Sequence, residues 1–217
     1  MDMRATGLEM TNQENKKESK QFQGTRKLFH VLSSSFIPLV YWFSPDFITE
    51  HQARTYLIAL LSCSLLFSFI FDLTRLLSPG INAFLMKHFS LLIRQTEEHR
   101  FTGATFLCFS FLVTILFFPR EISVAAMLFL SLGDTMAEIA GKNWGRRKFH
   151  GRSLEGMVGF FLMSLPVAWL TLGDWRVSLL GAAAGASIEF FSFHVDDNLS
   201  VPFLSALSIW FTLHYLF

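Results

Sequence analysis

The feature that most constrains this chain is a succession of seven apolar segments, each close to the length that crosses a lipid bilayer. A spanning helix needs about 20 mainly apolar residues, within a range of about 17–25. The segments cover residues 28–48, 55–77, 103–119, 121–141, 156–173, 175–193 and 199–217. Only 16% of the residues are charged, whereas a soluble domain carries about 25%. The sequence therefore predicts an all-α, polytopic integral membrane protein with about seven transmembrane helices.

The polar parts of the chain divide it into a tail and one membrane domain. Residues 1–24 contain almost no large apolar side chains, which predicts a disordered cytoplasmic tail. Residues 25–217 are expected to form a single transmembrane domain. The stretch 81–93 is apolar but too short to cross, so we expect an amphipathic helix lying in the membrane interface.

The orientation follows from the placement of Lys and Arg, which favour the cytoplasmic side. With the N-terminus inside and the segments alternating, the tail through Lys27 carries six of them, residues 75–102 four and residues 142–155 five. The opposite side keeps only Arg54, Arg120 and Arg176. We therefore expect a cytoplasmic N-terminus, in the inner membrane of a bacterium or the endoplasmic reticulum of a eukaryote.

Two carboxylates in the fourth segment stand where charge is costly. The twelve residues 122–133 rise about 18 Å as a helix, so a core of about 30 Å is not yet crossed at Asp134. Glu138 lies four residues later, on the same helix face, and an ionised carboxylate costs about 2.5–3.5 kcal/mol at the bilayer centre. A divalent cation such as Mg²⁺ between them would remove this penalty. An arginine from another helix would also do so, and the spacing leaves both readings open.

A basic stretch broken by glycines follows this pair. Glycine lets backbone N–H groups approach a ligand closely, and Arg and Lys bind phosphate oxygens. The pattern predicts a phosphate-binding loop, although a loop that only orients the protein would also be basic. The residues in question are Gly141, Lys142, Gly145, Arg146, Arg147, Lys148, Gly151, Arg152 and Ser153, with Glu155 and Gly156 next.

Further polar residues fall on the same predicted side of the membrane. They are Arg26, Lys27 and His30 before the first segment, Arg100, Thr102 and Gly103 before the third, Glu189 in the sixth, and Asp196, Asp197 and Asn198 before the seventh. Asp72 and Arg75 are three apart near the inner end of the second segment and predict a structural ion pair. Gly181 and Gly185 predict close helix packing. This gathering of polar residues on one side is what we expect of an enzyme that acts on a membrane-embedded substrate with a cytoplasmic co-substrate.

The order of these motifs resembles that of the CTP-dependent lipid-alcohol kinases, which comprise dolichol kinase, phytol kinase and yeast-type diacylglycerol kinase. These enzymes are similar in turn to CDP-diacylglycerol synthases. Two positions depart from the family pattern, since Arg152 stands where Lys is usual and Met157 where Ser or Thr is usual. The matching residues are 26–30, 98–100 with 102–105, 133–135 with Ala137, Gly141, Gly145 and Arg146, 152–156, and 196–198 with Pro202.

The resemblance implies transfer of the γ-phosphoryl group of CTP to the hydroxyl of a membrane lipid alcohol, with residues 25–217 as the catalytic domain. It places Asp134 and Glu138 on Mg²⁺ and gives Asp134, Asp196 and Asp197 catalytic roles. The implied partners are CTP and the lipid, with no nucleic acid. The implied nucleotide-binding residues are Gly141, Lys142, Gly145, Arg146, Arg147, Lys148, Arg152, Ser153, Glu155 and Asn198.

Two other functions remain open at the level of the sequence. A phosphatidate cytidylyltransferase would use the same basic loop and acidic residues but would release pyrophosphate in place of CDP. A transporter of an anionic solute would need polar groups through the whole membrane. The outer halves of the segments are apolar, which argues against a transporter.

Overall fold

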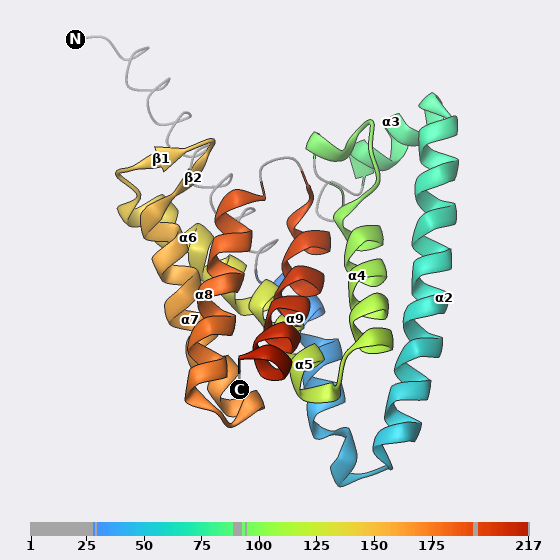
Figure 1. Ribbon diagram of the computed structural model, residues 1–217. Coiled ribbons are helices and arrows are strands. Elements are labelled where there is room, and N and C mark those ends of the chain that lie inside the picture. The colour runs from blue at the N-terminus through green and yellow to red at the C-terminus, as the bar shows by residue number, and fades with distance from the viewer. Residues whose placement is uncertain (1–27, 29, 89–92, 94, 193–194, 217) are drawn as a thin grey trace, which may run out of the picture.

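The computed structural model describes residues 28, 30–88, 93, 95–192 and 195–216 and is almost entirely helical. A first helix covers residues 30–43, and a small two-stranded sheet interrupts the helical bundle (Figure 1). The other elements are η1 (Ser44–Asp46), α2 (Glu50–Leu77), α3 (Pro79–His88), η2 (Gln95–Glu97), α4 (Gly103–Phe117), α5 (Arg120–Leu128), η3 (Phe129–Asp134), α6 (Thr135–Trp144), β1 (Lys148–Phe149), β2 (Arg152–Ser153), α7 (Leu154–Leu172), α8 (Trp175–Phe191) and α9 (Asp197–Tyr215).

Each of the seven apolar segments contains a helix, as the sequence predicts. In the described residues, three helical stretches are long and apolar enough to cross a membrane, Glu50–Leu77, Arg120–Trp144 and Leu154–Leu172, while Gly103–Phe117 is apolar but shorter. The structure thus agrees with an all-α membrane protein, and the number of seven spans stays a prediction. The expected tail, residues 1–24, lies outside the described residues.

The fourth segment forms the centre of the bundle. It is one continuous helix made of α5, the π-helical turn η3 and α6, and two thirds of its most apolar stretch (67%) is buried inside the protein. α5 contacts α7 and α9, and η3 contacts α7, α8 and α9. Asp134, the last residue of η3, is therefore placed among other helices and not against lipid.

Small residues allow the surrounding helices to approach this centre. A Cβ atom added at Gly133 would lie 2.7 Å from Ser164 Oγ in α7, and one at Gly185 would lie 2.9 Å from Phe129 Cδ2 in η3. A Cβ atom at Gly181 would lie 2.8 Å from Ile209 Cγ1 in α9. The close packing predicted for Gly181 and Gly185 is confirmed, and it holds η3 tightly in place.

Polar side chains fix where the helices begin and end. Thr49 and Gln52 form a capping box at the start of α2, and the Ser153 hydroxyl caps α7. Gly173 ends α7 with a φ of 71°, a conformation that favours glycine. The interfacial helix expected at 81–93 appears as α3, Pro79–His88, and residues 89–92 lie outside the described part.

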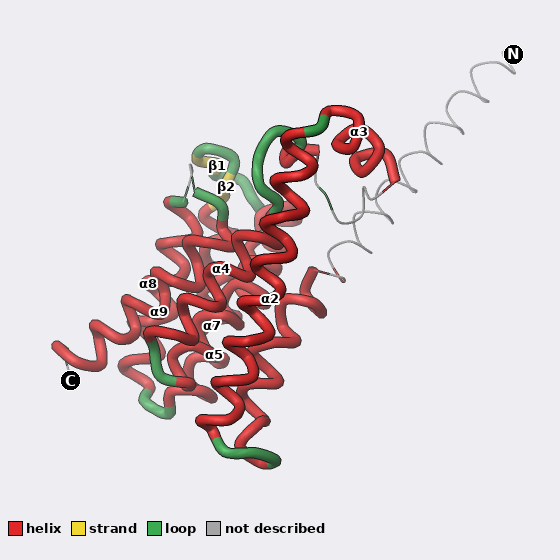
Figure 2. Tube along the Cα trace, turned by 90° about the vertical axis from the view of Figure 1, so that its right-hand side faces the viewer, coloured by secondary structure: helices red, strands yellow, loops and turns green. Residues whose placement is uncertain are grey.

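Several of the predicted motifs that the structure describes gather at one end of the bundle, called here the polar end. α3, the β1–β2 hairpin, the start of α4 and the start of α9 all lie at the top of Figure 1, and Figure 2 shows α3 and the hairpin at that same end. The turn between α7 and α8 lies at the opposite end. Residues that are far apart in the sequence are thus brought to one end of the helices.

Candidate functional site

The basic stretch is a β-hairpin and not an irregular loop. β1 and β2 pair antiparallel, with Phe149 opposite Arg152. The two turn residues His150 and Gly151 have φ angles of 47° and 88°, as a two-residue type I′ turn requires. The all-α prediction missed these two strands because a turn of two residues with positive φ was not expected at His150.

The cations before and within β1 point to solvent. Arg146, Arg147 and Lys148 are exposed, and none of them forms an ion pair with a residue that the structure describes. Exposed guanidinium and ammonium groups that are not bound by carboxylates are able to bind an anionic ligand. Phosphate binding by the hairpin stays a prediction.

The glycines of this stretch have a packing role. A Cβ atom at Gly141 would lie 2.9 Å from Ser153 Oγ, and one at Gly145 would lie 3.0 Å from the same atom. Ser153 is buried, and its hydroxyl accepts a hydrogen bond from the N–H of Gly156 at 3.0 Å. The carboxylate of Glu155 interacts with the backbone of Arg146 and Arg147. These contacts position the hairpin, and direct contact of these residues with a nucleotide stays a prediction.

Arg152 joins three segments of the chain. Its Nη1 lies 2.6 Å from Glu189 Oε1 in α8, and its Nη2 lies 2.5 Å from Asp197 Oδ1 in α9. The guanidinium also donates to the backbone carbonyl oxygens of Glu189 and Ser192. Burial lowers the pKa of Arg152, but Asp197 and Glu189 outweigh this effect and raise it above its usual value. Arg152 was predicted to hold phosphate, whereas its guanidinium is bound by two carboxylates.

Asp134 faces this cluster from η3. Its carboxylate is half-buried and lies within the electrostatic influence of Asp197, Glu189, Glu138 and Arg152. No hydrogen bond or ion pair of this carboxylate is found with the residues that the structure describes. Glu189 and Asp197 thus share the guanidinium of Arg152, and the Asp134 carboxylate lies near them without a described partner, so three carboxylates surround one cation.

Glu138 forms an ion pair with a residue outside the Arg152 cluster. Its Oε1 lies 2.5 Å from Lys142 Nζ, one turn further along α6, and both side chains are largely exposed. Within the described ranges, no group of three or more His, Cys, Asp or Glu side chains is arranged to hold a metal ion. Mg²⁺ is commonly held by one or two carboxylates together with substrate phosphates, and metal binding at Asp134 and Glu138 stays a prediction.

The acidic turn before α9 contains two side chains with structural partners. Asp196 Oδ1 accepts hydrogen bonds from the backbone N–H of Asn198 at 3.0 Å and from its Nδ2 at 2.8 Å. Ser110 Oγ donates to the carbonyl oxygen of Asn198 at 2.5 Å, and a Cβ atom at Gly103 would lie 2.7 Å from Asn198 Nδ2. Asp196 and Asn198 thus fix α9 onto α4, while Asp197 turns to Arg152. The catalytic and nucleotide-binding roles assigned to this turn stay predictions.

A second buried cluster, formed by Asp72 and Arg75 of α2, binds the residues just before α4 and at its start. Arg75 Nη2 lies 3.1 Å from Asp72 Oδ1, and both side chains are fully buried, which confirms the predicted structural pair. Asp72 Oδ2 accepts hydrogen bonds from the N–H and hydroxyl of Thr102 and from the hydroxyl of Thr105. Arg75 donates to Asn82 and to the backbone carbonyl groups of residues 97, 98 and 100.

The remaining motif residues lie in the segment between α3 and α4 or at the start of the first helix. Gly103 N–H donates to Glu97 Oε1 at 3.0 Å, and Arg100 contributes its backbone carbonyl group. The carbonyl oxygen of His30 accepts the Ser34 hydroxyl at 2.7 Å. Arg26 and Lys27 lie outside the described residues. Sequence reasoning gave Glu189 no role, although a lone carboxylate in an apolar helix is a signal that could have identified it.

Comparison with known proteins supports the resemblance seen in the motifs. The chain is 27% identical to an uncharacterised protein of Rickettsia prowazekii, over 89% of this chain and 96% of the relative. It is 26% identical to CTP-dependent diacylglycerol kinase 1 of Saccharomyces cerevisiae, over 64% of this chain and 58% of that kinase. A probable chloroplastic phytol kinase of Glycine max is 27% identical over 88% of this chain and 67% of its own length.

No protein-family profile matches the chain, and no solved structure matches it. The sequence relatives nevertheless confirm the predicted resemblance to CTP-dependent lipid kinases. The match to the yeast diacylglycerol kinase covers little more than half of that protein.

Proposed function

We propose that this chain is a CTP-dependent kinase that phosphorylates the hydroxyl group of a membrane lipid. The observation that carries the proposal is its similarity to proteins named for two different lipid alcohols, diacylglycerol and phytol. A lipid hydroxyl is what these two substrates share. The reaction transfers the γ-phosphoryl group of CTP to the lipid oxygen, releases CDP and frees the hydroxyl proton.

Two features of the polar end support this chemistry, namely its exposed cations and its carboxylates. The exposed Arg146, Arg147 and Lys148 offer positive charge to a triphosphate, while Asp134 faces the negative cluster behind the hairpin. Phosphoryl transfer depends almost entirely on positioning and charge neutralisation. We propose that Arg152 holds Asp197 and Glu189 in place and that the hairpin binds the nucleotide.

Asp134 fits a role in holding a divalent cation. It has no hydrogen-bonding or ion-pair partner among the described residues, and the carboxylates around it outnumber the cations. Mg²⁺ is commonly held by one or two carboxylates together with substrate phosphates. When bound, such a cation neutralises charge on the phosphates. Glu138 fits less well, because its carboxylate is bound by Lys142.

We further propose that seven helices span the bilayer and that the polar end faces the cytoplasm, where CTP is available. The test uses single cysteines in a variant that lacks Cys63 and Cys108. A reagent confined to the cytoplasmic side should label a cysteine at Arg147, and one confined to the outside should label the matched exposed position Arg176. The reverse labelling pattern would overturn this orientation.

The activity is tested with purified protein, CTP labelled on the γ-phosphate, and a panel of diacylglycerol, phytol and a polyprenol. We expect the label in one of these lipids together with CDP. Release of pyrophosphate with phosphatidic acid as acceptor would instead identify a cytidylyltransferase. Flux of an anionic solute into liposomes without CTP would identify a transporter.

A further inference from the structure

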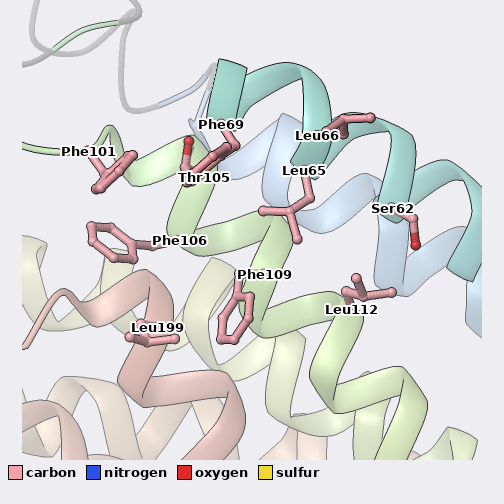
Figure 3. A pocket seen from close by; sticks show the side chains of 10 residues that line it. All are labelled: Ser62, Leu65, Leu66, Phe69, Phe101, Thr105, Phe106, Phe109, Leu112 and Leu199. Carbon is pink, nitrogen blue, oxygen red and sulfur yellow. The ribbon is translucent and has the colours of Figure 1, made fainter. Parts of the chain in front are cut away.

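An apolar groove runs along the outside of the bundle between α2 and α4. It has a volume of about 470 Å³, within the range of about 300–1,000 Å³ that is typical of small-molecule sites. Figure 3 shows Leu65 and Phe69 of α2 on the side toward Phe106 and Phe109 of α4, and Leu66 of α2 also lines the groove. Its lining contains no charged side chain and has two hydroxyl groups, those of Ser62 and Thr105.

The direction of the groove matches that of a lipid chain. Its lining on α2 extends from Ser62 to Phe69, which corresponds to about 10 Å along a helix at about 1.5 Å per residue. α2 is one of the helices long and apolar enough to cross a membrane, so the groove follows the direction in which this helix would cross it. Leu66 and Phe69 remain exposed at 61% and 44%, as side chains in contact with lipid would be.

The groove ends beside the polar end of the bundle. Phe69 stacks on Phe101 with ring centroids 5.6 Å apart, and Phe101 contacts Phe106 edge to face. Thr105, at the same end, donates its hydroxyl to the buried Asp72 at 2.7 Å. Leu199 of α9 also lines the groove, and it follows the turn that contains Asp197.

We propose that this α2–α4 groove binds the hydrocarbon chain of the lipid alcohol and thereby presents its hydroxyl group at the polar end. The inference rests on the proposed kinase function and adds the substrate-binding surface. An uncharged lipid alcohol needs no charged group along its chain, which matches the lining. Aromatic rings at the polar end would contact the first carbons below the hydroxyl.

A second groove, between α6 and α7, fits this ligand less well. It has a volume of about 590 Å³ and includes Arg147 and Glu155 in its lining. A guanidinium group at the end of an apolar groove favours an anionic lipid. Met136, which also lines it, is two residues from Asp134 and so points to a different face of the helix.

The first experiment locates the lipid without CTP. The full-length protein in phosphatidylcholine nanodiscs is irradiated with diacylglycerol or phytol that carries a diazirine in the chain, and the adducts are mapped by mass spectrometry. We expect adducts on Leu65, Phe106 and Phe109 that disappear with excess unlabelled lipid alcohol and persist with added phosphatidylcholine. Adducts spread around α2, located in the α6–α7 groove, or displaced equally by phosphatidylcholine would each overturn the proposal.

The second experiment measures kinetics on matched variants. Leu66→Trp fills the groove, whereas Phe67→Trp alters the neighbouring residue, which is 74% exposed and does not line it. We expect Leu66→Trp to raise KM for the lipid roughly tenfold, as changes in a hydrophobic pocket do, with KM for CTP unchanged. Leu162 lines the α6–α7 groove. An effect from Phe67→Trp, or from Leu162→Trp and not from Leu66→Trp, would contradict the proposal.

The two experiments separate this proposal from the proposed function. If no lipid alcohol receives phosphate from CTP but competed adducts still map to the α2–α4 groove, the kinase assignment fails and the lipid-binding groove stands. If a lipid alcohol is phosphorylated and Leu66→Trp leaves its KM unchanged, the kinase assignment stands and the groove proposal fails.

Discussion

Two clusters of carboxylate and guanidinium groups occur at the polar end, and they differ in charge balance and exposure. In the first, Asp72 and Arg75 are fully buried, and both carboxylate oxygens of Asp72 have partners. In the second, Arg152 is shared between Glu189 and Asp197, and Asp134 lies close by. The side chains of Arg152 and Asp197 are 19% and 32% exposed.

This difference separates a structural role from a functional one. A balanced pair closed off from solvent can stabilise a junction but cannot bind a second molecule without breaking apart. A partly exposed cluster with more carboxylates than cations has the capacity to take up a cation. We therefore expect variants of the first cluster to lose stability and variants of the second to lose activity.

The largest expected effect is that of Asp134→Asn, which removes one charge and keeps the shape of the side chain. Loss of a group that stabilises transition-state charge typically lowers kcat by about 10²–10³-fold or more. The thermal unfolding temperature should not fall, because the substitution relieves repulsion among like-charged carboxylates. Near-normal turnover with Mg²⁺ and CTP would show that Asp134 is not part of the catalytic site.

Asp72→Asn should give the opposite pattern. It leaves Arg75 buried without its carboxylate, and breaking such a pair typically costs about 3–5 kcal/mol in the free energy of unfolding. Thermal unfolding in detergent measures this loss. Glu138→Gln is the matched control, because its exposed pair with Lys142 should contribute only about 0.3–0.5 kcal/mol. Equal stability of the two variants would contradict the structural role given to the Asp72–Arg75 cluster.

Neutralising the hairpin cations tests the exposed part of the second site. The triple substitution of Arg146, Arg147 and Lys148 by Gln should weaken CTP binding roughly 10- to 100-fold, from up to about 1 kcal/mol for each exposed charge contact. Calorimetric titration with CTP measures the affinity, and the wild-type affinity should fall as salt concentration rises. Unchanged affinity in the triple variant would leave the hairpin as an orientation signal alone.

The smallest effect is expected for Arg152→Lys. Lysine keeps the positive charge but cannot contact Glu189, Asp197 and two carbonyl groups at once. We expect a loss of kcat of about tenfold or less, equivalent to about 1.4 kcal/mol or less, which is the net worth of one ordinary hydrogen bond. Arg152→Gln, which removes the charge, should be clearly less active than Arg152→Lys. If the two variants are equally active, the charge of Arg152 does not matter to the reaction.

Several features of the protein could be predicted from the sequence alone. The apolar segments indicated where the helices lie, because the length of an apolar run is a local property of the chain. The spacing of Asp72 and Arg75 was enough to predict their pair, since residues three apart meet on a helix. Alternation of the segments also predicted that the motifs near residues 100, 146 and 197 would share one end, as they do.

Other features were decided only by the tertiary structure. Arg152 meets Glu189 and Asp197 across 37 and 45 residues, and such a contact depends on how the helices are rotated and packed. Glu138 and Lys142 are four residues apart, so their pair was open to prediction from the spacing, whereas the lack of a described partner for Asp134 follows only from how the helices pack. The α2–α4 groove has the same origin, since a cavity exists only where the surfaces of two helices fail to fill the space between them.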